Sequence, residues 1–251
     1  MDSLDELSVK SNAKANAEAM SGVGVLDKSV GILSFLSGRG LASLAEVVDG
    51  TGLPRPTAHR LLSALETHHL VTRRDSRYAL GLRLLGWGNR AAGVGLVERA
   101  RPVLERLRDG TGESTQLYVR EGEHRVCVAA VERATGLRDT VPVGAVMSLT
   151  RGSAGKVLLA WGENNEISGG PDAAELGELR NRGWADSVAE REVGVASVSA
   201  PVFGPDGKLS AAVSASGPIS RLGEHPGERL AGRVIEAARE IEGALADGGS
   251  S

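Results

Sequence analysis

Residues 53–65 read LPRPTAHRLLSAL, and this stretch predicts an amphipathic helix. Four apolar residues fall at positions i, i+3, i+4 and i+7 and share one face: Ala58, Leu61, Leu62 and Leu65. That face must pack against neighbouring helices, whereas the opposite face is polar and carries His59, Arg60 and Ser63. Pro54 and Pro56 are tolerated at the front, because first-turn N–H groups have no acceptor within the helix.

The start of this predicted helix suits phosphate. Its prolines leave Arg55 and Thr57 displayed at the helix N-terminus, where anions bind favourably. A hydrophobic back, a short polar front and arginines at the start are the features of a recognition helix in a helix-turn-helix domain. On this stretch alone, an ordinary amphipathic helix with a solvated basic face is an equally good interpretation.

Two further helices are predicted before this one. The first covers residues 28–37, is capped by Asp27 and has an apolar stripe made of Val30, Leu33 and Leu36, widened by Ile32 and Phe35. The second opens at Ser43, an N-cap with Glu46 at the capping-box position, and is ended by glycines at positions 50 and 52. Two helices separated by a short turn that contains glycine make a helix-turn-helix.

A basic hairpin is predicted after the recognition helix. Residues 70–74 and 78–80 are short strand-like runs that flank residues 75–77, so they predict a wing with arginines at its tip. The order of elements is therefore that of a winged helix-turn-helix domain over residues 23–82, preceded by a disordered tail over residues 1–22.

The charge distribution agrees with a DNA-binding face. The whole chain of 251 residues has a formal net charge of −3, which by itself does not favour nucleic acid. Between residues 54 and 83, however, the acidic residues are only Glu66 and Asp75. They face six arginines: Arg55, Arg60, Arg73, Arg74, Arg77 and Arg83. A local excess of positive charge of this kind is the electrostatic footprint of a nucleic-acid-binding surface.

The rest of the chain predicts a second domain of the α+β class. Residues 83–112 are expected to form linker helices, with a turn or kink at Pro102. Residues 113–246 alternate strand patterns with helices and end in an amphipathic helix, so a mainly antiparallel sheet with helices beside it is expected. Residues 247–251 are a short tail.

No metal, cofactor, membrane or secretion signal stands out in the sequence. The single cysteine, Cys127, lies in an apolar run and is expected to be a buried strand residue rather than a disulfide or metal ligand. The N-terminus lacks an apolar signal region and no stretch is apolar enough to span a membrane, so we expect a cytoplasmic protein without a bound metal or cofactor.

The sequence resembles the isocitrate-lyase-regulator (IclR) family of bacterial transcription factors from about residue 23 to residue 245. Residues 52–62 and 78–85 are similar to the recognition helix and wing of the family, and residues 152–159 to its small-residue helix start. The spacing of its C-terminal signature is matched by Gly183, Ser187, Glu190, Ser197 and Phe203. Gly204 departs from it, because the family usually has Asp or Asn there.

The resemblance implies a winged helix-turn-helix domain joined by a linker helix to a GAF-like effector-binding domain. It implies a homodimer, or a dimer of dimers, on palindromic double-stranded operator DNA, with a small carboxylate metabolite such as an amino acid or a 2-oxo acid as effector. Residues 115–118, 136–144 and 194–202 are similar to a narrower branch that controls leucine and related amino-acid biosynthesis.

Two sets of site residues follow. We expect the middle of the helix to read bases in the major groove, its start to bind phosphates, and the wing to reach the backbone or the minor groove. The residues expected to contact DNA are Ser43, Arg55, Pro56, Thr57, His59, Arg60, Ser63, Arg73, Arg74 and Arg77. His59 has an intrahelical or backbone contact as an equal alternative. Carried over from the family by position, the effector pocket is expected to be lined by Leu137, Arg138, Thr140, Ser153, Ala154, Ser187, Val195, Ser197 and Ser199. Arg138 is expected to pair with a carboxylate of the effector.

The sequence does not favour an enzyme. Residues 152–157 are too short for a phosphate-binding loop and have Val157 where that loop needs a hydroxyl, and no G-x-S-x-G pentapeptide of a serine hydrolase occurs. We therefore expect no catalytic residues and no enzyme activity, and a repressor is the favoured type of regulator. The alternatives are a GAF-like sensor that signals through a protein partner, a constitutive DNA binder, and a regulator of carbon or aromatic catabolism.

Overall fold

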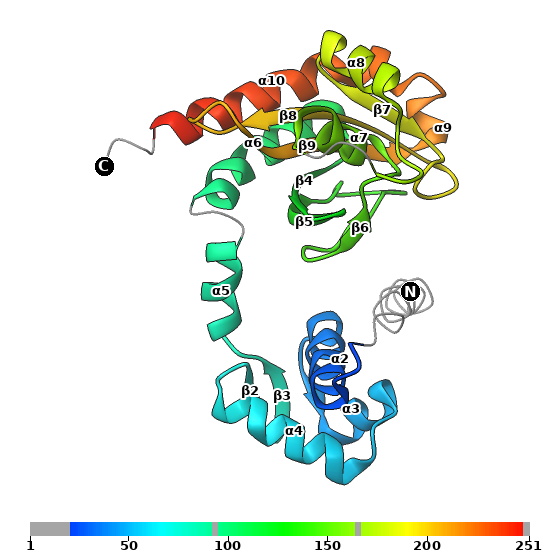
Figure 1. Cartoon of the computed structure of the whole chain (residues 1–251). Coiled ribbons are helices and arrows are strands. Elements are labelled where there is room, and N and C mark those ends of the chain that lie inside the picture. Colours follow the sequence, from blue (N-terminus) through cyan, green and yellow to red (C-terminus); the bar gives the residue numbers. More distant parts are fainter. Residues whose placement is uncertain (1–20, 92–94, 164–166, 248–251) are drawn as a thin grey trace. The chain divides into compact units, whose positions relative to one another are not determined.

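The computed structural model describes residues 21–91, 95–163 and 167–247, and its contacts divide the chain into two compact units, Met1–Ala91 and Ala92–Ser251 (Figure 1). The tails predicted over residues 1–22 and 247–251 lie almost wholly outside the described residues. Each unit is described by itself.

The first unit is a winged helix-turn-helix domain (Figure 1). Its elements are α2 (Gly24–Arg39), β1 (Ala42–Ser43), α3 (Leu44–Thr51), α4 (Arg55–Thr67), β2 (Val71–Arg74), β3 (Arg77–Leu80) and α5 (Arg83–Ala91). The strands form an antiparallel sheet in the order β1-β3-β2, in which β2 and β3 are the wing. The predicted helix-turn-helix and wing are therefore confirmed.

The predicted apolar face of α4 forms the centre of this unit. All four of its residues are buried: Ala58, Leu61, Leu62 and Leu65. They pack with Val47 of α3, with Ile32 and Leu36 of α2, and with Val71 and Tyr78 of the wing. At about 25 cal/mol per Å² of apolar surface, burial of one leucine side chain stabilises the domain by about 2 kcal/mol. The spacing of apolar residues in α4 thus fixes which of its faces is left for a ligand.

Two expectations for the first helix were wrong. Val30 is 47% exposed, because Ile32 is the buried residue of this turn and Val30 lies about 200° away from it around the helix axis. Asp27 does not cap the helix, since α2 begins at Gly24 with Val23 as N-cap, and Asp27 instead accepts hydrogen bonds from Ser21.

The second helix and the wing begin as predicted. Ser43 caps α3: its hydroxyl accepts from the Glu46 N–H at 3.3 Å, and the Glu46 carboxylate accepts from the Ser43 N–H at 2.8 Å. At the wing tip, Asp75 and Ser76 have φ of +46° and +66°. Two consecutive left-handed residues make the tight turn whose twist matches a two-residue β-hairpin.

The second unit contains a curled antiparallel sheet covered by helices, as the predicted α+β class requires (Figure 1). Its strands are β4 (Ser114–Glu121), β5 (His124–Val131), β6 (Val146–Ser148), β7 (Ala185–Val188), β8 (Val195–Phe203) and β9 (Leu209–Pro218), in the order β6-β5-β4-β9-β8-β7. Its helices are α6 (Leu96–Thr111), α7 (Ser153–Trp161), α8 (Ala173–Arg182), α9 (Ile219–Leu222) and α10 (Pro226–Asp247).

The two faces of this sheet carry separate cores. On one face, α6 and α10 pack on alternate strand residues: Leu117, Ala196, Val198, Ala200, Val213 and Ala215. On the other face, α7 packs on the residues between them, among which are Tyr118, Cys127 and Ala212, and α8 packs on α7. Because successive side chains of a strand point to opposite faces, serines 197 and 199 of β8 and serines 214 and 216 of β9 lie on the α7 side.

The helices of the expected linker differ from the prediction. Pro102 lies inside one helix, α6, so no new helix starts there, and the expected kink stays a prediction. A proline at the seventh residue removes only one hydrogen bond, while Ala100, Val103 and Leu104 remain packed in the core. The predicted linker over residues 83–112 is divided, since α5 belongs to the first unit and α6 packs on α10 and β5 of the second. Strand β6 and the short helix α9 were not predicted.

Cys127 is buried on β5 as predicted, and its thiol is expected to be inert in the folded protein. Burial raises the pKa of this thiol to about 12. The thiolate is the reactive form, so the native protein at neutral pH should not react with Ellman's reagent, whereas the protein unfolded in guanidinium chloride should react fully. Rapid reaction of the native protein would contradict the interpretation of Cys127 as a buried, inert thiol, because it would show that β5 opens locally.

Within the described residues, no helix is both long and apolar enough to cross a membrane, and no group of acidic, histidine or cysteine side chains is arranged to hold a metal ion.

Candidate functional site

The exposed face of α4 carries the polar residues that the sequence assigned to DNA. Arg55, Pro56, His59, Arg60 and Ser63 are exposed, and Thr57 is half-buried in the first turn. Pro54 is the N-cap, Pro56 has no N–H, and the Thr57 N–H donates to the Pro54 carbonyl oxygen at 2.9 Å. The donors at the start of α4 are therefore mainly side-chain groups such as the guanidinium of Arg55. Among the described residues, Arg55 and Arg60 have no ion-pair partner. This face can therefore present positive charge and hydrogen-bond donors to a ligand with negative charge.

The wing adds two arginines to this surface. Arg73 and Arg74 are exposed on β2, and the Arg73 guanidinium lies 5.7 Å from the ring centroid of Tyr78. That stacking restricts the side chain of Arg73 without neutralising it. His68 and His69 stand at the end of α4, where His68 is the C-cap.

Two of the expected DNA contacts are used within the domain itself. The Arg77 Nη2 atom donates to the Glu46 Oε2 atom at 2.8 Å, and Arg39 Nη2 is 3.9 Å from Glu46 Oε1. The hydroxyl of Ser43 is held in the cap of α3 by the same Glu46. The hydrogen bonds from Ser43 and the charges of the arginines lower the pKa of Glu46. The structure thus engages Arg77 and Ser43 in fixing the wing to α3.

A small cavity lies between the sheet and the start of α7 in the second unit. It has a volume of about 10 Å³, close to the space that one water molecule needs. The cavity is lined by Tyr118, Arg125, Asp139, Gly152, Ser153, Ala154, Arg191, Ser197, Ser214 and Ser216. The polar groups of this lining come from three sources: the strand face that points toward α7, the first turn of α7, and the loops that carry Asp139 and Arg191.

Serine hydroxyls form one wall of this cavity. Ser153 Oγ lies 2.7 Å from both Ser197 Oγ and Ser199 Oγ, and Ser199 Oγ donates to Ser214 Oγ at 3.0 Å. The same face of β9 continues to Ser216, which is within hydrogen-bond distance of Gln116 on β4. Hydroxyls both donate and accept, so this wall can serve either kind of partner.

The central contact of the cavity joins two loops. The Arg191 Nη2 atom donates to both carboxylate oxygens of Asp139 at 2.6 Å, and the Ser216 hydroxyl donates to Asp139 Oδ2 at 2.7 Å. Burial alone lowers the pKa of the Arg191 guanidinium, but the charge and hydrogen bonds of Asp139 outweigh burial and raise that pKa above its usual value. The Arg191 guanidinium therefore stays charged inside the protein.

A second guanidinium and a phenol complete the lining. Arg125 is 2% exposed, and its Nη1 atom donates to the carbonyl oxygens of Ser148 and Arg151. Its Nε atom is buried without a hydrogen-bond partner among the described residues. The guanidinium lies 5.6 Å from the ring centroid of Tyr118, a buried phenol whose pKa is raised by burial. Tyr118 is accordingly a neutral hydroxyl at the cavity.

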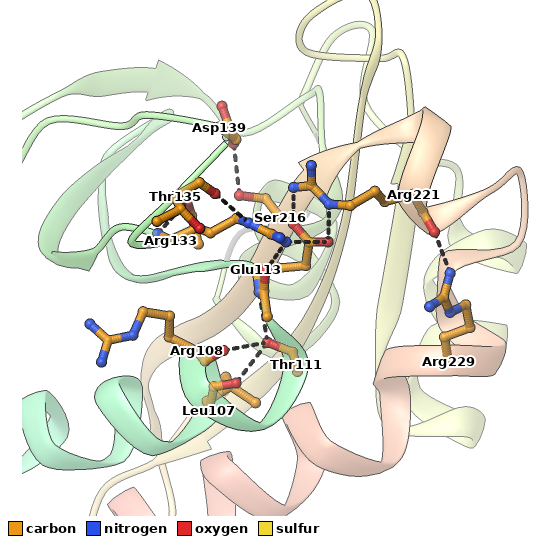
Figure 2. A network of polar contacts seen from close by, with 12 residues as sticks. Leu107, Arg108, Thr111, Glu113, Arg133, Thr135, Asp139, Ser216, Arg221 and Arg229 are labelled. Atoms are coloured by element: carbon orange, nitrogen blue, oxygen red, sulfur yellow. Dashed lines mark hydrogen bonds and ion pairs between the residues drawn. The ribbon is translucent and has the colours of Figure 1, made fainter. Parts of the chain in front are cut away.

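A buried ion cluster lies beside the cavity (Figure 2). The Glu113 side chain is 4% exposed and accepts from Arg221 Nε at 2.8 Å and from Arg221 Nη2 at 2.6 Å. Arg133 Nη1 lies 3.8 Å from Glu113 Oε1. Figure 2 shows this cluster next to Ser216 and Asp139. It ties the end of α6 to α9 and to the chain segment that follows β5.

The structure brings together only part of the expected effector pocket. Ser153, Ala154 and Ser197 line the cavity, and Ser199 is bonded to Ser153. Ser187 and Val195 lie on β7 and β8 outside the lining, although Ser187 pairs in register with Ser197.

The expected loop contribution shifts by one residue. Leu137 is 70% exposed and Thr140 is also exposed. Arg138 forms an ion pair with Glu132, with 2.7 Å between Nε and Oε2, and does not line the cavity. Asp139, between Arg138 and Thr140, is the residue that lines it. The arginine in the cavity is Arg191. Sequence reasoning missed Asp139, Arg191, Arg125 and Tyr118, and only the alternation of serines along β9 offered a signal for Ser214 and Ser216.

Comparisons with known proteins agree with both units. The IclR helix-turn-helix domain matches residues 25–75, and the domain described as "Bacterial transcriptional regulator IclR C-terminal" matches residues 90–169 and 173–243. The DNA-binding transcriptional repressor YiaJ of Escherichia coli is 30% identical, over 84% of this chain and 83% of its own. The glycerol operon regulatory protein of Streptomyces griseus is 30% identical, over 88% of this chain and 94% of its own.

The fold has a counterpart among solved structures. The crystal structure of the Thermotoga maritima IclR matches with a TM-score of 0.69 and 24% identity, covering 89% of this chain and 99% of that chain. The two matched domains cover nearly all of the described residues in the order that the two units have along the chain. This chain therefore belongs to the IclR family of bacterial transcriptional regulators, which are DNA-binding proteins and not enzymes.

Proposed function

We propose that this protein is a repressor that binds a palindromic operator as a homodimer and changes its DNA affinity when a small metabolite binds the second unit. The observation that carries the proposal is the exposed polar face of α4, where Arg55 and Arg60 have no ion-pair partner among the described residues. The name of the YiaJ relative, a transcriptional repressor, supports the direction of regulation. Such a protein acts on DNA in the cytoplasm.

In this proposal each part of the DNA-binding face has its own task. The start of α4, with Arg55 and Thr57, binds phosphates, while His59, Arg60 and Ser63 meet base edges in the major groove. Arg73 and Arg74 of the wing contact the backbone or the minor groove. A dimer presents two copies of α4, which fit half-sites about 34–36 Å apart, one turn of DNA. A metabolite that changes their separation changes the fit.

The regulated genes are proposed to serve the use of small carbon compounds. The glycerol operon regulatory protein of Streptomyces griseus supports this assignment by its name. The narrower prediction from the sequence, control of leucine or other amino-acid biosynthesis, has no counterpart in the names of the two relatives described above. Both assignments remain distinguishable by the sites that the protein selects.

Salt dependence tests the DNA-binding face. If Arg55, Arg73 and Arg74 of both protomers contact phosphates, about six counterions are released, and the logarithm of the association constant falls with the logarithm of salt concentration with a slope of about −5. Fluorescence anisotropy with labelled operator DNA should then show a loss of affinity of about a thousand-fold between 50 and 200 mM salt. DNA binding that is absent or insensitive to salt would instead favour a sensor acting through a protein partner.

Selection of genomic DNA tests the regulatory role. The full chain is incubated with sheared genomic DNA, and the bound fragments are sequenced without ligand, with leucine, and with branched 2-oxo acids. Enrichment of a palindrome upstream of a metabolic operon supports the proposal, and a change of enrichment with one ligand identifies the effector. Equal enrichment under all conditions would point to constitutive DNA binding, and no enrichment would overturn the proposal.

A further inference from the structure

We propose that the cavity between the sheet and α7 receives a small carboxylic acid, with Arg191 as the acid-binding residue and the Asp139 carboxylate as a substitute ligand that the acid displaces. This proposal rests on the proposed function, because the acid is then the effector of the regulator. It replaces the expectation that Arg138, which the structure leaves on the surface, pairs with the effector.

The burial of Asp139 is unusual for its position. It belongs to a segment without helix or strand between β5 and β6, and it is 7% exposed, whereas its neighbours Arg138 and Thr140 are exposed. A carboxylate taken from water into the interior carries a large desolvation cost unless charges and hydrogen bonds compensate it. The loop therefore inserts a single charged group into a site that is equipped to hold one.

Asp139 is bound as a free acid would be. Both carboxylate oxygens of Asp139 lie 2.6 Å from Arg191 Nη2, and Oδ2 also accepts a hydrogen bond from the Ser216 hydroxyl at 2.7 Å. None of these partners belongs to the segment that carries Asp139: Ser216 lies on β9 and Arg191 on the loop between β7 and β8. The contact depends on tertiary structure alone, so a ligand with the same group can take the same partners.

The charges of the lining favour an anion. The charged residues of the lining are two guanidiniums, Arg125 and Arg191, and one carboxylate, Asp139. Glu190 lies nearby, where it shares Lys156 Nζ with Glu175 at 2.7 and 3.2 Å. The buried Nε atom of Arg125 lacks a hydrogen-bond acceptor among the described residues. When Asp139 leaves, the lining keeps two guanidiniums, no carboxylate and an unused buried donor. Such a site is better matched by an added anion than by a neutral molecule.

The hydroxyl groups of the lining indicate which other groups the acid carries. Serine hydroxyls from α7, β8 and β9 and the neutral phenol of Tyr118 surround the carboxylate position. They suit an acid that carries a hydroxyl or oxo group beside its carboxylate. The free volume of about 10 Å³ is too small for such an acid while Asp139 is in place, so binding requires Asp139 to leave.

Chemical rescue tests this idea on the full-length protein. In Asp139→Ala the loop loses the carboxylate that holds it to Arg191, so acetate, a small acid of the proposed class, can bind Arg191 in its place as the loop moves away. We expect this variant to have a lower melting temperature, because Arg191 loses its partner, and we expect millimolar acetate to restore most of the loss. Acetate should not shift the melting temperature of the wild-type protein at the same concentration.

Three controls separate a specific site from general salt effects. Acetamide, which has the shape of acetate without its charge, should not stabilise Asp139→Ala. The double variant Asp139→Ala with Arg191→Gln should not respond to acetate, because the acid-binding group is gone. The matched variant Glu132→Ala removes the carboxylate of the exposed pair with Arg138 and should show no rescue either.

The outcomes distinguish this proposal from the proposed function. If acetate stabilises Asp139→Ala no better than acetamide, the acid site is overturned. If Asp139→Ala does not fold, Asp139→Asn replaces it, and this variant should bind pyruvate about ten-fold more tightly than the wild type, because its loop competes less for Arg191. Equal affinities for pyruvate would also overturn the site. Operator binding is measured in parallel, and its absence with intact rescue would refute only the regulatory function.

Discussion

Replacing Arg60 with alanine is expected to weaken operator binding at least thirty-fold while leaving the fold of the protein unchanged. Arg60 is exposed in the middle of α4, opposite the buried Leu62, and has no ion-pair partner among the described residues. A bidentate contact between arginine and guanine contributes about 1–3 kcal/mol of discrimination, and a dimer loses two such contacts, or about 2–6 kcal/mol. Anisotropy titrations on the selected operator measure the loss.

The matched control for this prediction is Arg239→Ala, an exposed arginine on α10 in the other unit. It removes the same charge and should leave operator affinity nearly unchanged. Melting temperatures of both variants should equal that of the wild type, because neither side chain packs in a core. Equal operator affinity of Arg60→Ala and the wild type would show that this face of α4 does not enter the groove.

Replacing Arg221 with alanine is expected to destabilise the second unit by about 3 kcal/mol. The variant leaves the nearly buried Glu113 carboxylate with Arg133, 3.8 Å away, as its remaining ion-pair partner among the described residues. Removal of one partner from a buried pair costs about 3–5 kcal/mol, and the remaining contact with Arg133 places the expected loss at the low end. Thermal or urea unfolding should show a decrease in melting temperature of about 6–12 °C.

A surface ion pair provides the comparison. Arg106 and Glu240 lie 2.5 Å apart between α6 and α10, but their side chains are 61% and 44% exposed. Solvent screening limits such a pair to about 0–1 kcal/mol, so Arg106→Ala should change stability little. If Arg221→Ala is no more destabilising than Arg106→Ala, the Glu113 cluster does not hold the end of α6 to α9.

The DNA-binding unit was predictable because its elements are specified locally. The period of apolar residues in α4 predicted its buried face, and Ser43 with Glu46 predicted where α3 begins. Residues 75–77 predicted the wing turn, which the structure narrows to Asp75 and Ser76 because Arg77 begins β3. The same reasoning failed at Val30, since Val30 and Ile32 are equally apolar and only packing against α3 and α4 decides which of the two is buried.

The cavity was predictable only in its regular parts. Ser153, Ser197 and Ser199 were all predicted from the family resemblance, and the structure shows that Ser197 and Ser199 share a strand face that meets Ser153. Asp139 and Arg191 lie in loops, where no period tells which residue points inward. The choice between Arg138 and Asp139 is made by Arg191, about fifty residues further along the chain. Such long-range contacts leave no local sequence signal.

Glu46 has a consequence for the thermodynamics of DNA binding. One carboxylate caps α3 through Ser43 and anchors the wing through Arg77. The wing is therefore oriented before DNA arrives, and its ordering is part of folding rather than of association. Because less conformational entropy is lost on binding, more of the favourable free energy of the phosphate contacts remains as affinity. Arg77, which pairs with Glu46 instead of DNA, acts in this way to preorganise the wing.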